Sequence, residues 1–287
     1  MSFDVVHLNG RLLPRSEAKV GVDDRGFLLG DGLFETMRAY QGRPAFLGEH
    51  LARLRHGAAA MRLALPDDLA ARVAATLAAN GMPDCAVRVT VTRGPGGRGA
   101  SPRGAGPPTV LVALSPIPYA EELYSCGLAA VTAPAPPSLG LKATSYAAHV
   151  LARIAADDAG ADEAILVDGT GALLEATQAN VFLVRGDELL TPPAVGVLPG
   201  VTRATLLRIA PEAGLTPREA RLTPADARGA DEALLCASVL EVAPVASLDG
   251  APLRRGDVAD RLRRLYRLHA TRSGETSPSE GLKHHVG

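Results

Sequence analysis

Lysine is scarce in this sequence of 287 residues. Lysine and arginine together number 30, yet the lysines are only Lys19, Lys142 and Lys283. A reaction that depends on a primary amine therefore has few candidate residues here. The basic residues form no dense run and the formal net charge is -1, which argues against nucleic acid as the main partner.

Cysteine is equally sparse, and its spacing argues against two common uses of the residue. Cys85, Cys126 and Cys236 are far apart, odd in number and not part of a CxxC pair. This pattern favours free thiols in a reducing compartment over disulfides or a zinc site. No charged-then-apolar signal segment opens the sequence, and no apolar stretch approaches the ~20 residues that a membrane helix requires. We therefore expect a soluble, cytoplasmic protein with no membrane partner.

Several catalytic and nucleotide-binding motifs are also missing. The sequence contains no GKS or GKT, no GxSxG and no HExxH, and its scattered histidines suggest no metal site. Residues 94–99 match GxGxxG after an expected strand, but a dinucleotide site also requires a helix to begin there. Pro102, Pro107 and Pro108 exclude that helix, so we predict a flexible loop that carries arginines.

The remaining composition and periodicity predict a globular protein of mixed structure. Apolar residues make up 47% of the chain, enough for a sizeable core. Asn9-Gly10 between short apolar runs predicts an N-terminal hairpin. Helical spacing is found over 47–65, 68–80, 144–159, 202–213 and 258–269. Strand patterns are found over 33–40, 86–92, 109–114, 163–167, 179–184, 188–191, 234–237 and 242–246. Clustered strands with inserted helices favour the α+β class.

A proline-rich break divides the sequence into two parts. Residues 115–118 read Ser-Pro-Ile-Pro, which interrupts regular structure. We expect a small N-terminal domain over residues 1–115, a linker over 116–120 and a larger domain over 121–271. Residues 272–287 are rich in serine, glycine and glutamate, which predicts a disordered tail.

Lys142 lies between a proline-rich connection and an expected helix. Its neighbours are apolar or hydroxylated, with no carboxylate close in the sequence. An apolar environment lowers the pKa of a lysine amine, and only the neutral amine attacks a carbonyl. An ordinary surface lysine at a helix start would have a similar local sequence, so this setting alone leaves both interpretations open.

Two further segments allow a structural and a functional interpretation. Glu175 is a lone acid between apolar stretches, and it is either a solvated turn residue or the partner of a buried cationic nitrogen. Leu198-Pro199-Gly200 leads into an expected helix, where Thr202 suits an N-cap. The same geometry also makes an anion site, because free amides and the helix dipole converge at a helix start.

Taken in order, these segments resemble the class IV, or fold type IV, pyridoxal-phosphate enzymes. That family includes branched-chain aminotransferases, D-amino acid aminotransferases and aminodeoxychorismate lyases. The resemblance extends over about residues 8–250, and its blocks are 27–36, 49–54, the Lys142 segment, 175–182, 198–203 and 241–245. It implies a small N-terminal α/β domain and a larger domain with a barrel-like sheet. It also implies pyridoxal 5'-phosphate in the cleft between them, and a homodimer in which the first domain of one subunit closes the other's site.

The resemblance assigns roles to individual residues. Lys142 would form a Schiff base with the cofactor and then move the substrate Cα proton as general base and acid. Glu175 would keep the pyridine nitrogen protonated, and Tyr146 would donate a hydrogen bond to the cofactor's phenolic oxygen. The phosphate would be held by Arg53, Val201, Thr202 and Ser238. The remaining expected cofactor contacts are Asn180 and Leu198.

The expected substrate residues are Phe27, Phe34, Thr36, Arg98 and Val239. The two phenylalanines would form apolar walls of the pocket. Arg98 is either a ligand for a substrate carboxylate, since a guanidinium binds carboxylate at two points, or a solvated loop arginine.

The branches of the family differ in reaction, and the sequence carries features of more than one. The stretch over 93–99 and Thr36 look closest to the lyases, whereas 142–146 and 240–245 look like the aminotransferases. The Arg-x-His pair of the D-amino acid enzymes is absent, because Ala100 stands in the place of the histidine. We predict transamination between an amino acid or amine and a 2-oxo acid. Release of pyruvate and 4-aminobenzoate from aminodeoxychorismate is the alternative, and a catalytically silent cofactor-binding protein is a remote one.

Overall fold

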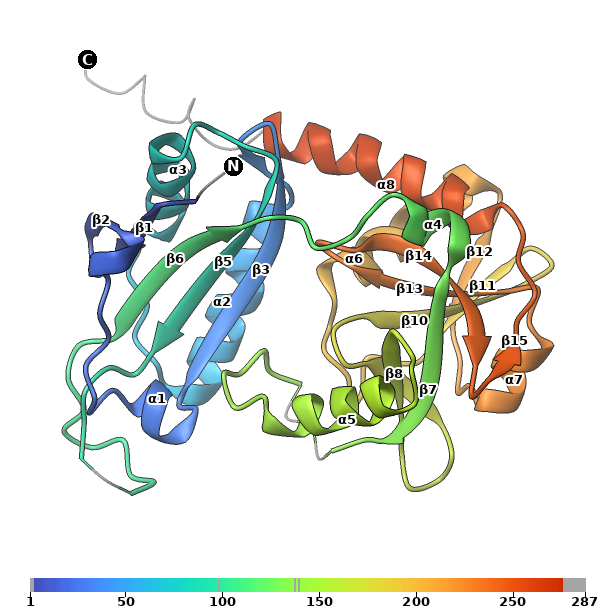
Figure 1. Ribbon diagram of the computed structural model, residues 1–287, viewed down its shortest axis with the longest axis horizontal. Coiled ribbons are helices and arrows are strands. Elements are labelled where there is room, and N and C mark those ends of the chain that lie inside the picture. Colours follow the sequence, from blue (N-terminus) through green and yellow to red (C-terminus); the bar gives the residue numbers. More distant parts are fainter. Residues whose placement is uncertain (1–2, 98, 137, 139, 276–287) are drawn as a thin grey trace, which may run out of the picture.

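A computed structural model describes residues 3–97, 99–136, 138 and 140–275, and their strands form two sheets (Figure 1). The first sheet has the order β2-β1-β6-β5-β3-β4, and every neighbouring pair in it is antiparallel. Its strands are β1 (Val5–Leu8), β2 (Arg11–Pro14), β3 (Gly32–Tyr40), β4 (Arg43–Pro44), β5 (Cys85–Thr92) and β6 (Thr109–Ser115). Its helical segments are η1 (Arg15–Glu17), α1 (Arg25–Leu29), α2 (Leu47–Met61) and α3 (Leu69–Ala79). Apolar residues of α2 and α3 pack against valines and leucines of β5 and β6.

The second sheet closes on itself. Six of its strands pair in the ring β10-β13-β14-β7-β8-β9, and Asn180 of β10 then pairs with Glu175 of β9 to complete the circle. The ring strands are β7 (Leu128–Pro134), β8 (Glu163–Val167), β9 (Leu173–Ala176), β10 (Asn180–Arg185), β13 (Glu232–Ala237) and β14 (Glu241–Leu248). The attached strands are β11 (Glu188–Thr191), β12 (Thr216–Glu219) and β15 (Ala251–Pro252). The barrel-like sheet and the α+β class expected from the sequence are confirmed.

Helices surround this second sheet, and one of them reaches the first sheet. They are α4 (Glu122–Cys126), α5 (Ala147–Asp158), α6 (Val201–Ile209), η2 (Ala210–Ala213), α7 (Pro224–Gly229) and α8 (Val258–Glu275). Helix α8 runs along the top of the molecule in Figure 1 and contacts β13 and β14 as well as β3 and β4. None of the helices in the described part of the chain has both the length and the hydropathy of a membrane span.

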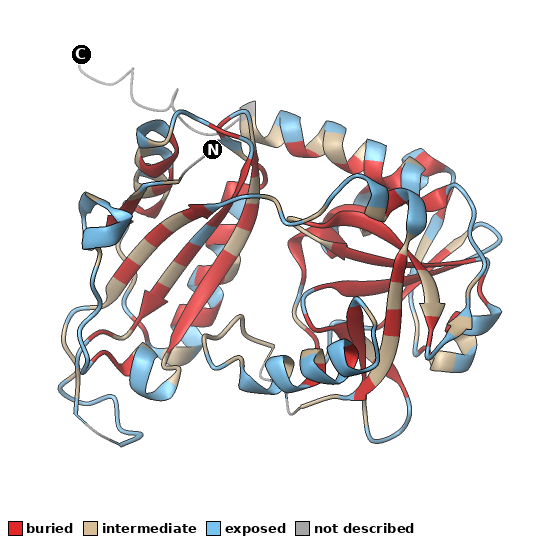
Figure 2. Cartoon of the chain, in the orientation of Figure 1, coloured by how far each residue is buried: buried red, intermediate tan, exposed pale blue. Residues whose placement is uncertain are grey.

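Burial follows the two sheets, whose inward faces are the buried bands of Figure 2. One buried charge cluster joins them. Glu241 of β14 is fully buried and pairs with Arg263 and Arg267 of α8 and with Arg38 of β3. A buried carboxylate is stable only when cations and donors surround it, so this cluster holds α8 and β3 to the same point of the second sheet.

Several local structures agree with the sequence pattern, and others differ for identifiable reasons. The N-terminal hairpin is present, and φ is 48° at Asn9 and 88° at Gly10, as a two-residue turn of this type requires. The helix expected over 47–65 ends at Met61, because Arg62 takes a left-handed conformation with φ of 49°. Helix α8 continues to Glu275, so 272–275 of the expected tail are helical, and 276–287 lie outside the described residues.

The helix expected over 144–159 begins only at Ala147. The segment before it is held along β3 instead. Phe34 N donates to Lys142 O at 2.9 Å, and Thr144 N donates to Gly32 O at 2.9 Å. The break expected near residue 115 coincides with the end of β6 at Ser115, and the division into domains at that point stays a prediction.

Candidate active site

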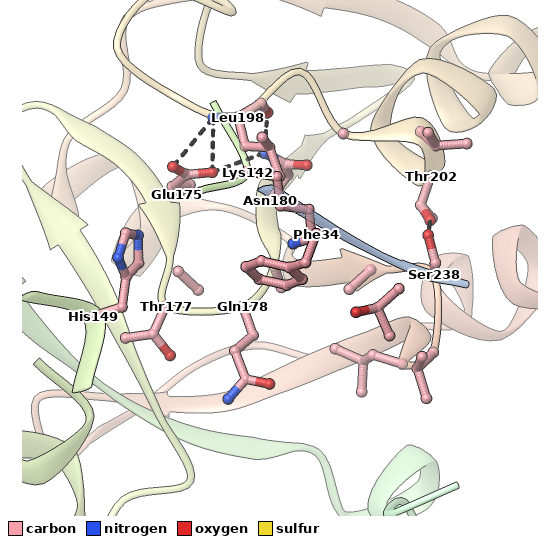
Figure 3. Close-up of a pocket in the computed structure, with 18 of the residues that line it drawn as sticks. Phe34, Lys142, His149, Glu175, Thr177, Gln178, Asn180, Leu198, Thr202 and Ser238 are labelled. Carbon is pink, nitrogen blue, oxygen red and sulfur yellow. Dashed lines mark hydrogen bonds between the residues drawn. The ribbon is translucent and has the colours of Figure 1, made fainter. Parts of the chain in front are cut away.

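A cavity of about 530 Å³ lies between the first sheet and the barrel. All of the expected cofactor residues line it, namely Arg53, Lys142, Tyr146, Glu175, Asn180, Leu198, Val201, Thr202 and Ser238. On the expected substrate side Phe34, Thr36 and Val239 also line it. Residues far apart in the sequence therefore converge on one site, part of which Figure 3 shows in close-up.

Lys142 reaches this cavity from an extended segment rather than from a helix. Pairing with β3 fixes its backbone, and its Nζ lies 4.6 Å from the centre of the Phe34 ring. Burial, and then the positive charge of Arg53, lower the pKa of the Lys142 amine to about 8. A substantial fraction of the amine is therefore neutral near pH 7–8, as nucleophilic attack on a carbonyl requires.

Glu175 lies at one end of the cavity on β9. Its carboxylate oxygens accept hydrogen bonds from Leu198 N at 3.2 and 3.1 Å, and one of them accepts from Asn180 Nδ2 at 3.4 Å. Its hydrogen-bond donors in the described part of the chain are neutral amides. Burial raises the pKa of this carboxyl to about 7, and a cationic ligand nitrogen would stabilise its ionised form.

The opposite end of the cavity presents donors suited to an anion. Helix α6 begins at Val201, and its first N–H groups are free, as in any helix start. A Cβ built on Gly200 would clash with Asn180 Oδ1, so a larger residue here would have to displace the Asn180 side chain. The hydroxyls of Thr202 and Ser238 lie 3.4 Å apart beside this turn.

Arg53 is anchored before any ligand binds. Its Nε and one terminal nitrogen donate to the two oxygens of Glu35 at 2.7 and 2.6 Å, and its other terminal nitrogen donates to Pro199 O at 3.0 Å. A guanidinium has five N–H groups, so about two remain for an anion in the cavity. Burial alone would raise the pKa of the Glu35 carboxyl, but the hydrogen bonds from Arg53 and His50 hold it at about 2.

Tyr146 lines the cavity and uses its hydroxyl proton within the protein. Its hydroxyl donates to Thr177 O at 2.6 Å, its ring stacks on His149 at 4.3 Å, and its edge meets Phe34 at 5.7 Å. A phenol carries one O–H, so in this arrangement Tyr146 can only accept a hydrogen bond from a ligand. The expected donation to the phenolic oxygen of the cofactor would require this hydroxyl to turn away from Thr177 O, and it stays a prediction.

Two expected substrate residues fall outside the described cavity. Phe27 does not line it and is 78% exposed on α1, because the turn at Gly30 separates α1 from the strand that carries Phe34. Phe27 therefore forms no wall of the cavity in its own chain, and its expected part in the pocket stays a prediction. Arg98 lies outside the described residues.

Arg88 was missed by the sequence analysis. Its guanidinium carbon lies 3.7 Å from the centre of the Phe34 ring, and it lines the cavity. The signal was present in β5, where buried Val87, Val89 and Val91 alternate with residues of the other face. That alternation predicts an outward arginine but does not say that the outward face borders a cavity. Glu35 and His50 were also missed, although both lie within the blocks that carried the resemblance.

The cavity fits a flat ligand that carries three different functional groups. A carboxyl that lacks a cation faces one end, a partly neutral lysine lies between, and amides, hydroxyls and Arg53 converge at the other. Pyridoxal 5'-phosphate has a ring nitrogen, a carbonyl and a phosphate in the corresponding order, so the residues present fit this cofactor.

Comparisons with known proteins agree with this geometry. The family model described as "Amino-transferase class IV" matches residues 32–248. A protein of Methanocaldococcus jannaschii named "Putative branched-chain-amino-acid aminotransferase" is 34% identical, over 94% of this chain and 97% of its own. The D-alanine aminotransferase of Bacillus licheniformis is 33% identical, over 88% and 90% of the two chains.

A solved structure is similar over nearly the whole chain. It is a hypothetical aminotransferase from Mycobacterium tuberculosis, in a form bound to alpha-ketoglutarate and PMP. Its TM-score to this chain is 0.82 with 28% identity, and the alignment covers 93% of this chain and 98% of that one.

Proposed function

Because this chain belongs to the class IV aminotransferase family and is a pyridoxal-phosphate-dependent transaminase, we propose that a dicarboxylic 2-oxo acid serves as its amino acceptor. In this proposal Arg88 binds the distal carboxylate of the acceptor. The observation that carries it is the position of the Arg88 guanidinium over Phe34, on the same ring that the Lys142 amine approaches.

The surroundings of Arg88 support an anionic ligand. Its side-chain hydrogen bond within the described residues runs from Nε to Thr90 Oγ1 at 3.2 Å, so the terminal nitrogens are available to the cavity. Burial lowers the pKa of the Arg88 guanidinium, and a carboxylate beside it would offset that cost. The alpha-ketoglutarate bound to the Mycobacterium tuberculosis protein is consistent with a dicarboxylic acceptor.

We propose that Lys142 is the catalytic residue. Pyridoxal phosphate, when bound, supplies an electron sink for the negative charge that develops at the substrate Cα. The Lys142 amine would hold the cofactor at its carbonyl carbon and, when free, would take the proton from the substrate Cα. Its lowered pKa suits this task, because a general base works best when its pKa lies near the working pH.

The other cavity residues hold the cofactor in this proposal. Leu198 N and Asn180 hold the Glu175 carboxylate toward the ring nitrogen. The remaining N–H groups of Arg53, the first amides of α6 and the hydroxyls of Thr202 and Ser238 bind the phosphate.

We also propose a cytoplasmic homodimer in which the first domain of one subunit covers the site of the other. Large apolar side chains are exposed on α1 and α5, including Phe27 at 78% and Leu151 at 68%. Large apolar residues exposed on two helices favour burial against another surface. The free, buried thiols of Cys85 and Cys236 are consistent with a reducing compartment. Analytical ultracentrifugation of the purified chain tests the dimer, and a monomer at micromolar concentration would contradict it.

The acceptor is tested with 2-oxoglutarate and pyruvate in wild type and Arg88→Gln. Loss of a two-point carboxylate contact should raise the KM for 2-oxoglutarate by about tenfold to a hundredfold, on the order of 1.4–3 kcal/mol. Pyruvate has no distal carboxylate, so its KM should stay within about threefold. Arg185→Gln, which removes an exposed ion pair with Asp226 on the outside of the barrel, is the matched control.

Equal effects of Arg88→Gln on both acceptors would show that Arg88 has no part in recognising the distal carboxylate. Conversion of the holoenzyme to its amino form by an amino acid distinguishes transamination from the lyase reaction. Release of pyruvate and 4-aminobenzoate from aminodeoxychorismate without that conversion would favour the lyase.

A further inference from the structure

We propose that His50 is a proton-coupled switch of the phosphate site. When an anion binds there, His50 takes up a proton on Nε2, reverses its hydrogen bond with Ser238 and releases the Ser238 hydroxyl as a donor toward the anion. The inference rests on the proposed phosphate site, and it concerns residues behind that site rather than the ligand contacts themselves.

The switch is built from a continuous series of contacts. His50 is fully buried on α2, and its Nδ1 lies 2.7 Å from Glu35 Oε2. Its Nε2 lies 3.1 Å from Ser238 Oγ. Thr202 Oγ1 lies 3.4 Å from Ser238 Oγ and 3.3 Å from the hydroxyl of Tyr266. Figure 3 shows the Thr202 and Ser238 hydroxyls turned toward one another at one side of the cavity.

The direction of each hydrogen bond follows from the charge of Glu35. This carboxyl, held at a pKa of about 2, can only accept at neutral pH, so His50 Nδ1 carries a proton and donates to it. A neutral His50 then has a bare Nε2 that accepts from the Ser238 hydroxyl. In that state the Ser238 proton points away from the cavity, and Thr202 can donate to Ser238.

Protonation of His50 reverses this order. Nε2–H then donates to Ser238 Oγ, and the Ser238 proton turns toward the cavity. Ser238 Oγ can still accept from Thr202, because a hydroxyl oxygen has two lone pairs. One proton on His50 therefore supplies an anion with the Ser238 hydroxyl as a donor and with one more nearby positive charge.

Charges of both signs face His50, so the state of this ring depends on what else lies near it. Burial opposes the protonated form most strongly, and the pKa of His50 is lowered as a result. Glu35 on β3 favours the protonated form, whereas Arg53 on the same helix and Lys142 on the segment along β3 oppose it. The groups that face it from the other elements are the neutral hydroxyls of Ser238 and, one step further, Thr202. An anion in the cavity adds the negative charge that favours protonation.

The alternative is that His50 is a core histidine that stays neutral and only supports Glu35. Sulfate separates the two ideas, because it remains a dianion throughout the range from about pH 6 to 9 and brings no proton of its own. Sulfate binding to the cofactor-free protein is measured by calorimetry in buffers of different ionisation enthalpy, which counts the protons taken up per anion.

The decisive quantity is the difference in proton uptake between wild type and His50→Gln, since Lys142 and Glu175 also titrate in the cavity. We expect His50→Gln to take up about half a proton to one proton fewer at pH 7–8. His56→Gln, which changes an exposed histidine of the same helix, should match wild type. Equal uptake in wild type and His50→Gln would overturn the switch.

Nitrogen NMR of histidine-labelled wild type gives a second readout that needs no variant. The His50 Nε2 resonance should move from the unprotonated to the protonated range as sulfate saturates the site. Sulfate that competes with pyridoxal phosphate while His50 stays neutral would overturn the switch alone. Sulfate that does not compete with pyridoxal phosphate would overturn the proposed phosphate site and the switch together.

Discussion

Two buried glutamates, Glu175 at one end of the cavity and Glu35 behind Arg53 at the other, have opposite surroundings. Glu35 contacts Arg53 and His50, and these partners hold its pKa at about 2. Glu175 contacts only backbone and side-chain amides in the described part of the chain, and its pKa is raised to about 7. Burial raises the pKa of both carboxyls, so the difference comes from the partners rather than from depth.

The two carboxylates differ in which group balances their negative charge, a group of the protein or a group of the ligand. The negative charge of Glu35 is neutralised by the protein itself, and its effect is to orient Arg53 and His50. The negative charge of Glu175 has no such partner among the described residues, and it is most stable when a ligand provides the cation. Lys142 lies between the two, and both carboxylates oppose the loss of its proton.

The largest expected effect on activity comes from removing the Lys142 amine, which lies between the two glutamates. Lys142→Ala should lower kcat by about a thousandfold or more, because general acid–base groups contribute typically about 10²–10⁴-fold and attachment of the cofactor is lost as well. The absorbance band of the lysine-bound cofactor should also disappear. Lys19→Ala, at an exposed lysine, should leave both unchanged. Wild-type turnover in Lys142→Ala would show that catalysis does not depend on the Lys142 amine.

A second substitution removes the charge of Glu35, the glutamate that is paired with cations of the protein. Glu35→Gln should lower the free energy of unfolding by about 3 kcal/mol, because removing one partner of a buried ion pair leaves the other charge uncompensated. Urea denaturation of the cofactor-free protein measures it. Glu188→Gln, which removes an exposed pair with Arg218, should cost no more than about 1 kcal/mol. Equal losses of unfolding free energy in the two variants would show that the Glu35 ion pair stabilises the fold no more than an exposed ion pair does.

The sequence predicted Glu175 and Arg53 as site residues, but it missed Glu35 and gave the environment of neither glutamate. The order of blocks around Lys142, Glu175 and Thr202 was enough to predict the fold and the lining of the cavity. It could not show that Arg88 faces the cavity, because alternation along β5 gives the face of a side chain and not what lies opposite. Phe27 shows the same limit, since a residue only a short distance before Phe34 in the sequence lies beyond a turn and faces away.

A smaller effect on kcat than that of Lys142→Ala is expected at the unpaired end. Glu175→Gln keeps the shape of the side chain but cannot offer a charge to the ring nitrogen. A hydrogen bond to a charged group is worth up to about 3 kcal/mol, so kcat should fall by about a hundredfold. The cofactor should remain bound through Lys142 and the phosphate site, and the absorbance of the holoenzyme checks this. Unchanged turnover would show that the ring nitrogen does not depend on the Glu175 charge.

The same variant also tests how the free energy of unfolding depends on pH. The folded pKa of Glu175 is about 7, above the value of about 4.5 for an unfolded chain, so the folded protein binds the extra proton between these values. Glu175 therefore lowers the stability of the cofactor-free protein as the pH rises from about 4.5 to 7, by about 3 kcal/mol in total. Glu175→Gln should remove this loss and be the more stable protein at pH 8. Glu35, whose folded pKa is depressed, acts with the opposite sign and stabilises the fold above about pH 4.5. If wild type and Glu175→Gln showed the same dependence of unfolding free energy on pH, the charge at the unpaired end would already be compensated within the protein.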